Sequence, residues 1–321
     1  MGLKLCLDCG GTKTLGLLFD EQYRLLGIGQ GGATNLRFET EETIDAAMRT
    51  CLKNCLGDHV GVELDKVYMT SFKNRDKLMD IIRESCKVNQ VHILSEGETC
   101  LLAGAQTREG MVALSGTGST LFDLNKQSQA VAGGWGSWIG DEGSGYYIGN
   151  HGIVSAIRHS EGRGQETLIT EFIMEQFKLK QLRQFIQLLY DNNSPRNVIS
   201  SISMLVSKAA RFDDESALQI LRGAGAAMAE QMVAFISREK NRSEKMIVVA
   251  GGAWKSGRIM FDTFCATVRG QYPEIKIQLP IYEPVMGGVI EDMLLAGIDP
   301  RVEAPMDNLL QPFDFFQYRL Q

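Results

Sequence analysis

The sequence predicts an α/β protein of two lobes, with mixed β-sheets flanked by helices and an active-site cleft between the lobes. Three observations lead to this prediction. The chain has 321 residues, more than one compact domain usually holds. Strand-like runs alternate with helix-like runs, which is typical of sheets whose faces are covered by helices. A strand–turn–strand pattern with a turn rich in glycine and hydroxyl groups occurs twice, once in each expected lobe.

The first lobe is expected to begin with three antiparallel strands and a helix. The strand-like runs are Leu3–Leu7, Leu15–Phe19 and Arg24–Ile28, separated by turns. Glu41 and Glu42 then place negative charge in a first helical turn, where it complements the helix dipole. The apolar stripe at helical spacing is Ile44, Met48, Cys51 and Cys55, and it carries the helix to about Leu56.

Alternation of strands and helices continues to the expected lobe boundary near residue 112. The predicted elements are strands at Val67–Thr70 and Val91–Leu94 and helices at Arg75–Cys86 and Thr99–Gln106. The second lobe is expected to open with strands at Met111–Leu114 and Ser119–Leu124. This division assigns residues 1–112 to one lobe and 113–321 to the other.

Helices are expected to dominate the segment from about Asn150 to Lys240. The amphipathic stretches lie near Gln165–Gln181, Arg183–Tyr190 and Asp214–Arg238. A buried strand is expected at Lys245–Ala250, followed by Gly251-Gly252 and a helix from about Gly257. The pair Gly287-Gly288 precedes the last expected helix, which is a candidate to pack back on the first lobe.

Composition excludes several classes of function. The chain is 44% hydrophobic and 22% charged, as in ordinary globular proteins, and its net charge of −6 with scattered basic residues argues against a nucleic-acid partner. No apolar run approaches 18 residues and no signal-like segment begins the chain, so a soluble, cytoplasmic protein without membrane contact is expected. The seven cysteines are interpreted as reduced thiols, and the four histidines lack zinc-ligand spacing.

The segment Asp8-Cys9-Gly10-Gly11-Thr12-Lys13-Thr14 is the most informative motif. Gly10 and Gly11 let the backbone approach a ligand closely, while Thr12 adds a hydroxyl and Lys13 a positive charge. These features predict a loop that binds phosphate. Asp8, at the end of the preceding strand, is positioned to hold Mg²⁺. Coordination through water is expected, because this ion loses its water reluctantly. The alternative is a plain hairpin turn.

The second lobe repeats this chemistry in Ser115-Gly116-Thr117-Gly118-Ser119. Gly116, Thr117 and Gly118 are therefore predicted to form a second phosphate loop. Gly251 and Gly252, which follow a buried strand, could pack against the base or ribose of a nucleotide. An ordinary strand-to-helix turn is the alternative for that pair.

The densest glycine stretch runs from Gly133 to Gly145 and contains two tryptophans and two acidic residues. Such a composition makes a poor core element, because glycine loses much entropy on folding and buries little surface. A ligand-shaping loop is expected, with Asp141 placed to bind hydroxyl groups, although either tryptophan taken singly could be plain packing. The glycines of Gly27–Gly32 fit a dinucleotide motif only superficially, because no helix opens there at once, and a mobile loop is expected instead.

The motifs together resemble the BadF/BadG-type ATPases, and within them the N-acetylglucosamine kinases, of the actin-like superfamily of ATPases and sugar kinases. The resemblance spans nearly the whole chain, and the segment GGWGSWIGDEGSG is its most specific part. It implies two ribonuclease-H-like lobes that close over ATP, Mg²⁺ and a sugar, in a homodimer.

Carried over by position, the resemblance assigns roles to individual residues. It implies a metal-associated Asp8, phosphate loops at Gly10, Gly11, Thr12 and Lys13 and at Gly116, Thr117 and Gly118, adenosine-side Gly251 and Gly252, and sugar contacts from Asn35, Gly134, Trp135 and Asp141. The catalytic base is expected at Glu96, where the family usually has an aspartate in Asn-Asp-Ala. A shift in the alignment would move that role to Glu98.

The activity that the resemblance implies is ATP-dependent phosphorylation of an amino-sugar hydroxyl, most simply O6 of N-acetylglucosamine or a related hexosamine. One departure concerns the sugar assignment, because Ser71-Phe72-Lys73 stands where relatives commonly have small glycine-rich residues. Two alternatives stay open. One is an ATPase that activates a partner enzyme, although such proteins need paired cysteines for an iron–sulfur cluster and only Cys265 follows Cys100 here. The other is a non-catalytic sensor of sugar and ATP.

Overall fold

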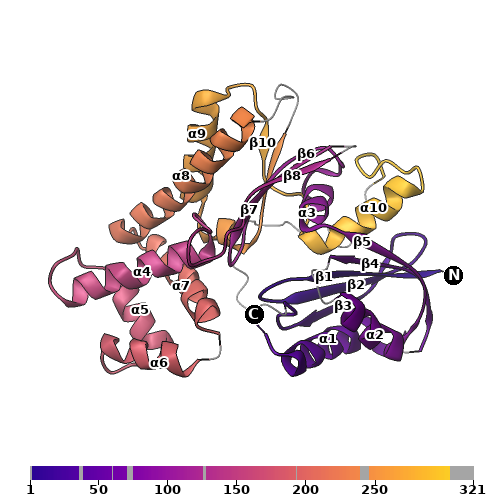
Figure 1. Ribbon diagram of the computed structural model, residues 1–321, viewed down its shortest axis with the longest axis horizontal. Coiled ribbons are helices and arrows are strands. Elements are labelled where there is room, and N and C mark those ends of the chain that lie inside the picture. The colour runs from indigo at the N-terminus through magenta and orange to yellow at the C-terminus, as the bar shows by residue number, and fades with distance from the viewer. Residues whose placement is uncertain are drawn as a thin grey trace. The chain divides into compact units, whose positions relative to one another are not determined.

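The computed structural model describes residues 2–35, 39–59, 61–70, 75–125, 128–192, 194–238 and 246–303. Contacts divide the chain into two compact units (Figure 1). The first comprises the residues up to Glu109 together with the segment that begins at Pro280, and the second runs from Gly110 to Leu279. The domain limits 1–112 and 113–321 stay a prediction, whereas this grouping places the segment after Pro280 with the first unit.

The first unit is built on a five-stranded sheet of order β3-β2-β1-β4-β5. Its strands are β1 (Leu3–Cys9), β2 (Thr14–Phe19), β3 (Leu25–Gly31), β4 (Glu63–Thr70) and β5 (Lys87–Leu94). The first three strands are antiparallel, as predicted, and β4 and β5 run parallel to β1. Because parallel strands end at the same edge of a sheet, the carboxyl ends of β1, β4 and β5 lie together.

Helices cover both faces of this sheet (Figure 1). They are α1 (Glu41–Leu56), α2 (Arg75–Ser85), α3 (Glu96–Ala105) and α10 (Gly287–Leu295), with the short 3₁₀ helices η1 (Gly57–His59) and η4 (Pro284–Met286). Side chains alternate along β1: Leu5 and Leu7 join the core under α1 and α2, whereas Cys6 joins the core under α3 and α10. Both faces of the sheet are therefore buried.

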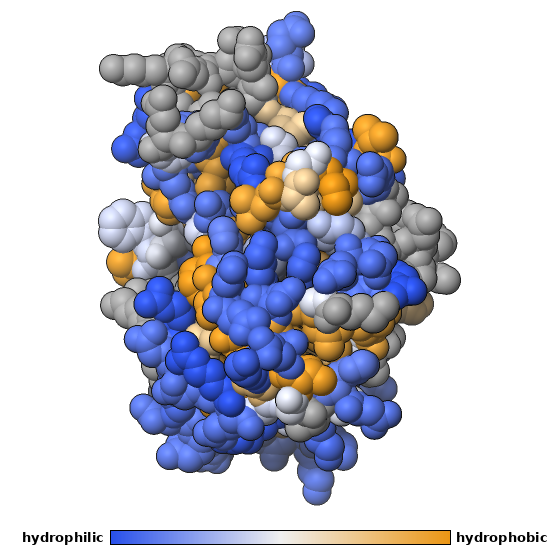
Figure 2. Space-filling view, turned by 90° about the vertical axis from the view of Figure 1, so that its right-hand side faces the viewer, coloured by the Kyte–Doolittle hydropathy of each residue, from blue (hydrophilic) through white to orange (hydrophobic). Residues whose placement is uncertain are grey.

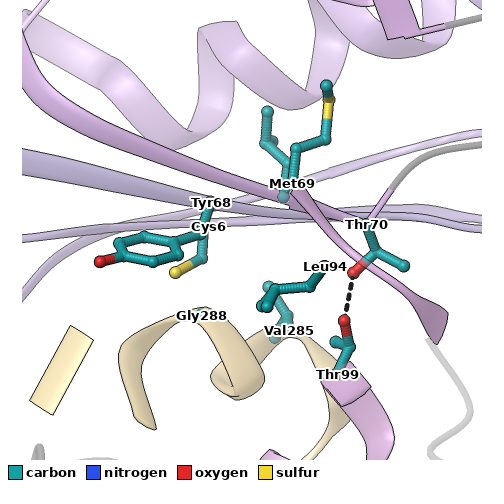
Figure 3. Close-up of a pocket in the computed structure, with 9 residues that line it drawn as sticks. Cys6, Tyr68, Met69, Thr70, Leu94, Thr99, Val285 and Gly288 are labelled. Atoms are coloured by element: carbon teal, nitrogen blue, oxygen red, sulfur yellow. Dashed lines mark hydrogen bonds between the residues drawn. The ribbon is translucent and has the colours of Figure 1, made fainter. Parts of the chain in front are cut away.

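The first turn of α10 packs directly on the sheet (Figure 3). A Cβ on Gly288 would lie 2.5 Å from both Cys6 Sγ and Tyr68 Cβ, and one on Gly287 would lie 2.6 Å from the carbonyl oxygen of Thr99. The prediction that these glycines precede the helix was therefore wrong. They are its first two residues, and the missing side chains let Gly288 pack against the sheet and Gly287 against α3.

A buried carboxylate also anchors α10 to the sheet. Asp292, with 2% of its side chain exposed, accepts hydrogen bonds from Tyr68 Oη at 2.7 Å and from Lys4 Nζ at 2.5 Å. Tyr23 Oη lies 3.1 Å and Lys66 Nζ 3.4 Å from the same carboxylate. Burial alone would raise the pKa of Asp292, but these donors hold the pKa below its usual value. The charge is thus compensated, as a buried charge must be.

The glycines of β3 allow α1 to lie against the sheet. Cβ atoms built on Gly27, Gly29 and Gly31 would each lie 2.0 Å from a carbonyl oxygen of α1, those of Cys55, Cys51 and Ala47 respectively. The prediction of a mobile loop at Gly27–Gly32 was therefore wrong, because this segment is a strand up to Gly31. Glycine at every second position provides a smooth surface for the helix backbone.

The second unit repeats the topology of the first. Its strands are β6 (Gly110–Ser115), β7 (Ser119–Leu124), β8 (Gln129–Gly133), β9 (Ile247–Ala250) and β10 (Ile277–Gln278). The order is β10-β9-β6-β7-β8, with β6, β7 and β8 antiparallel and β9 and β10 parallel to β6. The first strand is central in both sheets and its hairpin partner lies on one side, so the duplicated ribonuclease-H-like arrangement is confirmed.

Most of the helices in the described chain belong to the second unit. They are α4 (Gly145–Ser160), α5 (Leu168–Gln176), α6 (Phe185–Asp191), α7 (Pro195–Ala210), α8 (Glu215–Arg238) and α9 (Arg258–Gln271), with the 3₁₀ helices η2 (Leu182–Gln184) and η3 (Gly252–Ser256). Trp254 is fully buried in η3, where its indole N–H donates to the carbonyl oxygen of Ala113 at 2.9 Å. This contact ties the segment after β9 to β6.

Polar side chains dominate the face shown in Figure 2, and hydrophobic residues form smaller patches among them. Within the described ranges, none of the helices combines the length and the apolar character needed to cross a lipid bilayer.

Replacing Gly29 by alanine is expected to destabilise the protein by about 2–3 kcal/mol, because the new methyl group would force α1 away from β3. Gly270 provides the matched control, since it is exposed in α9 and a Cβ there would meet no described atom within 4 Å. Gly270→Ala should stabilise by up to about 1 kcal/mol through helix propensity. Chemical denaturation of both variants measures the two effects, and equal stability of Gly29→Ala and the unmodified protein would contradict the packing argument.

Candidate functional site

The parallel strands of the first unit place two predicted carboxylates at one edge of the sheet. Asp8 pairs in register with Thr70, the last residue of β4, and Thr70 pairs with Leu94, the last residue of β5. Glu96 follows Leu94 by two residues and begins α3. The topology therefore brings Asp8 and Glu96 to the same edge from positions far apart in the sequence.

The predicted first phosphate loop lies at this edge, between β1 and β2. The N–H of Gly10 donates to the carbonyl oxygen of Lys13 at 3.0 Å, and the carbonyl oxygen of Gly10 accepts from the N–H of Thr34 at 3.1 Å. Thr34 Oγ1 also lies 2.9 Å from Thr14 Oγ1. These bonds fasten the segment around Asn35 to the loop, and a Cβ on Gly11 would lie 3.9 Å from Asn35 Nδ2. Thr12 and Lys13 are exposed at the loop tip.

Burial and nearby charges change the acidity of the two carboxyl groups. Burial, together with the negative charge of Glu283, raises the pKa of Asp8 to about 6, although Lys13 acts in the opposite direction. Burial and the charge of Asp8 raise the pKa of Glu96 to about 7. The site thus holds acids whose charged forms are disfavoured in the free protein, a property common at functional sites.

The side chain of Glu98, the alternative base, caps the start of its own helix, α3. Its carboxylate accepts from the N–H of Ser95 at 2.8 Å, and Ser95 Oγ accepts from the N–H of Glu98 at 3.2 Å. This reciprocal arrangement is a capping box, which satisfies two N–H groups at the start of α3. Glu96, which interacts electrostatically with Asp8, takes no part in the box.

Two features of this edge were missed by the sequence analysis. Glu283, just before η4, brings a third carboxyl group close enough to Asp8 to raise its pKa. Thr70 Oγ1 lies 2.7 Å from Thr99 Oγ1 beside the end of β4 (Figure 3). None of these residues belongs to a recognisable motif, because each reaches the site only through tertiary packing. Ser71-Phe72-Lys73, which weakened the sugar assignment, lies outside the described residues.

In the second unit, the predicted second phosphate loop joins β6 to β7. Gly116 donates its N–H to the carbonyl oxygen of Gly118 at 2.8 Å, which closes the turn. Gly251 adopts φ +100, and a Cβ there would lie 2.4 Å from the carbonyl oxygen of Ser115. The loop and the predicted adenosine-side glycines are therefore in direct backbone contact. Cβ atoms on Gly116 and Gly252 would meet no described atom within 4 Å.

The predicted sugar loop lies against this second phosphate loop. The N–H of Gly134 donates to the carbonyl oxygen of Ser119 at 2.9 Å, and a Cβ on Gly118 would lie 2.7 Å from Asp141 Oδ2. Asp141 is buried with 4% of its side chain exposed, whereas Trp135 is 75% exposed. The structure thus gathers Gly116–Gly118, Gly134, Asp141, Gly251 and Gly252 around the β6–β7 turn.

The residues of the first unit fit Mg²⁺ held largely through water. Within the described ranges, no three His, Cys, Asp or Glu side chains are arranged to hold a metal between them. Mg²⁺ commonly keeps several waters and uses only one or two carboxylates together with substrate phosphates. Burial, together with nearby negative charge, raises the pKa values of Asp8 and Glu96, so a cation at this edge would stabilise their charged forms. Asp8, beside the predicted first phosphate loop, is the residue that would hold the ion.

The fold and these two glycine-rich turns define a class of protein. Two sheets with one topology, each carrying a glycine-rich turn between its first two strands, form the actin-like ATPase fold. The chain belongs to the BadF/BadG/BcrA/BcrD ATPase family, whose model matches residues 5–291. The family predicted from the motifs is therefore confirmed.

Individual relatives carry kinase names. The chain is 27% identical over 294 residues to an N-acetylmuramic acid/N-acetylglucosamine kinase of Clostridium acetobutylicum, covering 88% of this chain and 96% of that protein. It is 24% identical over 312 residues to an N-acetyl-D-glucosamine kinase of Dictyostelium discoideum, covering 88% and 95%.

Solved structures support the fold assignment. A provisionally assigned N-acetylglucosamine kinase of Chromobacterium violaceum superposes with a TM-score of 0.67 at 18% identity, covering 90% of this chain and 98% of that one. At this identity the likeness shows the fold alone.

Replacing Glu96 by glutamine is expected to stabilise the free protein at pH 8 but hardly at pH 5. The folded-state pKa of about 7 exceeds the ordinary value of 4.5, so the folded protein favours the protonated acid. Ionisation therefore lowers stability as the pH rises from about 4.5 to 7, and the full penalty of up to about 3 kcal/mol applies above that range. Thermal unfolding without nucleotide, sugar or metal measures it.

Glu98→Gln is the matched control, because glutamine also completes a capping box. It should leave the pH dependence unchanged. Equal stabilisation by Glu96→Gln at both pH values would show that ionisation of Glu96 is not the cause.

Proposed function

We propose that this protein is an ATP-dependent kinase that phosphorylates an amino-sugar, with O6 of N-acetylglucosamine or a related hexosamine as the acceptor. The observation that supports it most is the placement of Asp8 and Glu96 beside the first phosphate loop, in a chain whose relatives are named as amino-sugar kinases. Phosphoryl transfer needs mainly alignment of the reactants and stabilisation of charge, and these residue types serve those needs.

The phosphate side of the proposed site uses both glycine-rich turns. Phosphate oxygens are bound by the backbone N–H groups of Gly10, Gly11, Thr12, Gly116, Thr117 and Gly118. The hydroxyl groups of Thr12 and Thr117 also contribute, and Lys13 adds positive charge. Gly251 and Gly252 contact the adenosine. A bound Mg²⁺ would neutralise charge on the phosphates, and Asp8 is the residue assigned to hold it.

The sugar side is assigned to Asn35, Gly134, Trp135 and Asp141. Asn35 lies against the first loop, and Asp141 lies against the second, so each could orient hydroxyl groups close to the phosphates within its own unit. The exposed indole of Trp135 offers an apolar surface for the sugar ring. The buried carboxylate of Asp141 would select hydroxyl donors, since an unpaired buried acceptor is costly.

Glu96 is assigned as the general base that accepts the proton of the attacking hydroxyl. Its position beside Asp8 and its freedom from the capping box favour it over Glu98. A pKa of about 7 suits a base that accepts a proton near neutral pH. The homodimer expected from the resemblance stays a prediction, which light scattering of the purified protein would test.

An assay of ATP consumption across amino-sugars tests the proposed function. N-acetylglucosamine, N-acetylmuramic acid, glucosamine and N-acetylmannosamine should be compared, with phosphorylated product detected by mass spectrometry. At least one should be phosphorylated, and its 6-deoxy analogue should bind without turnover. ATP hydrolysis that needs no sugar would favour the ATPase alternative, and binding of sugar and ATP without any product would favour a sensor.

Glu96→Gln is expected to lower kcat by about 10²- to 10⁴-fold while both substrates still bind, because a general base typically contributes that much to the rate. Glu98→Gln should change kcat little, since its role lies in the helix cap. Steady-state kinetics with the best sugar and calorimetric titration of sugar and ATP make the comparison. If Glu98→Gln lowered kcat severely and Glu96→Gln lowered it only slightly, Glu98 and not Glu96 would be the base.

A further inference from the structure

Arg196, an arginine outside every sequence motif, contacts the predicted sugar loop. Arg196 lies in the first turn of α7, and 20% of its side chain is exposed. Its Nε donates to Ser137 Oγ at 2.6 Å, and its Nη2 donates to Asp141 Oδ2 at 3.3 Å. Ser137 Oγ in turn donates to the same Oδ2 at 3.1 Å. The three side chains therefore form a closed triangle of hydrogen bonds.

This triangle fixes a carboxylate whose backbone is in an unfavourable conformation. Asp141 has φ +59, in the left-handed region that residues with a side chain seldom adopt. Such a conformation persists when the surrounding contacts determine it, and it is found preferentially at functional sites. Both side-chain hydrogen bonds described for this carboxylate reach Oδ2, which leaves Oδ1 as the oxygen for another donor.

The triangle also touches the second phosphate loop. A Cβ on Gly118 would lie 2.7 Å from Asp141 Oδ2 and 2.9 Å from Arg196 Nη2. A shift of either charged group would therefore change the space around that loop. Only glycine fits at this position without displacing the ion pair.

We propose that Arg196 is a positioning residue for the acceptor sugar. It holds the carboxylate of Asp141 directly and through Ser137, so that the other carboxylate oxygen receives a sugar hydroxyl. This inference rests on the proposed function, because Asp141 is assigned there to the sugar. Arginine suits the task better than lysine. Its rigid planar group directs separate N–H groups to Ser137 and Asp141, whereas an ammonium ion is a point charge without that geometry.

The test measures KM for sugar, KM for ATP, kcat and thermal stability in the full-length protein, with the sugar that the wild type phosphorylates best. Arg196→Ala should raise the sugar KM about 10- to 100-fold, because it removes a charged hydrogen bond that orients the ligand's acceptor. The KM for ATP should stay within about threefold. Arg196→Lys should recover only part of the loss, and the surface variant Arg222→Ala, which removes an exposed pair with Glu215, should match the wild type.

A double-mutant cycle separates positioning from general stabilisation. In an Asp141→Asn background, Arg196→Ala should change the sugar KM by less than about threefold, because the group it positions is already altered. The inference would be overturned if Arg196→Ala raised the sugar KM by the same factor with and without Asp141→Asn. An equal rise in the KM values for sugar and ATP would also overturn it. If Arg196→Ala does not fold, Ser137→Ala replaces it, and a sugar KM unchanged in that variant would also overturn it. A wild type without any sugar turnover would overturn the proposed function and this inference with it.

Discussion

Parallel pairing of β1 with β4 and β5 is the constraint on which the candidate site of the first unit depends. The register Asp8 to Thr70 to Leu94 places three strand ends at one edge, so groups distant in sequence meet without any local signal. The β1–β2 hairpin turns at that same edge, which adds the glycine-rich loop to the carboxylates. Ligands of open α/β sheets bind where parallel strands end, and the geometry here follows that rule.

This placement has an energetic cost in the free protein. Asp8 and Glu96 are half-buried, the surrounding protein removes water from both carboxyl groups, and Lys13 offsets the charge of Asp8 only in part, so both pKa values rise. By contrast, the buried Asp292 of α10 is surrounded by donors, and its pKa falls. Protein groups thus compensate the charge of Asp292, which holds the fold together, whereas the fold leaves the charges of Asp8 and Glu96 uncompensated. Uncompensated charges are expected where a ligand, and not the protein, supplies the compensating groups.

Local patterns predicted most of the fold, and tertiary contacts explain the failures. The helix Glu41–Leu56 and the paired hairpins followed from periodicity and turn residues alone. The strands β8 and β10 were not predicted, because one is largely exposed and the other has two residues. The glycines of β3 were misread because glycine usually indicates a loop, whereas here it serves the approach of α1. Glu283 and Arg196 carried no motif, so only the folded structure could connect them with Asp8 and Asp141.

Glycines of the second unit divide into two groups according to what surrounds them. Gly118 and Gly251 are required by the protein itself, because a Cβ at either position would collide with Asp141 or with the backbone of Ser115. Gly116 and Gly252 meet no described atom that would exclude a methyl group. Glycine at such positions lowers stability, since it loses more conformational entropy on folding than alanine does. Gly270 is equally unobstructed, so open space alone does not indicate a ligand; at Gly116 and Gly252 the proposed site adds a reason, because phosphate and adenosine would approach the backbone closely there.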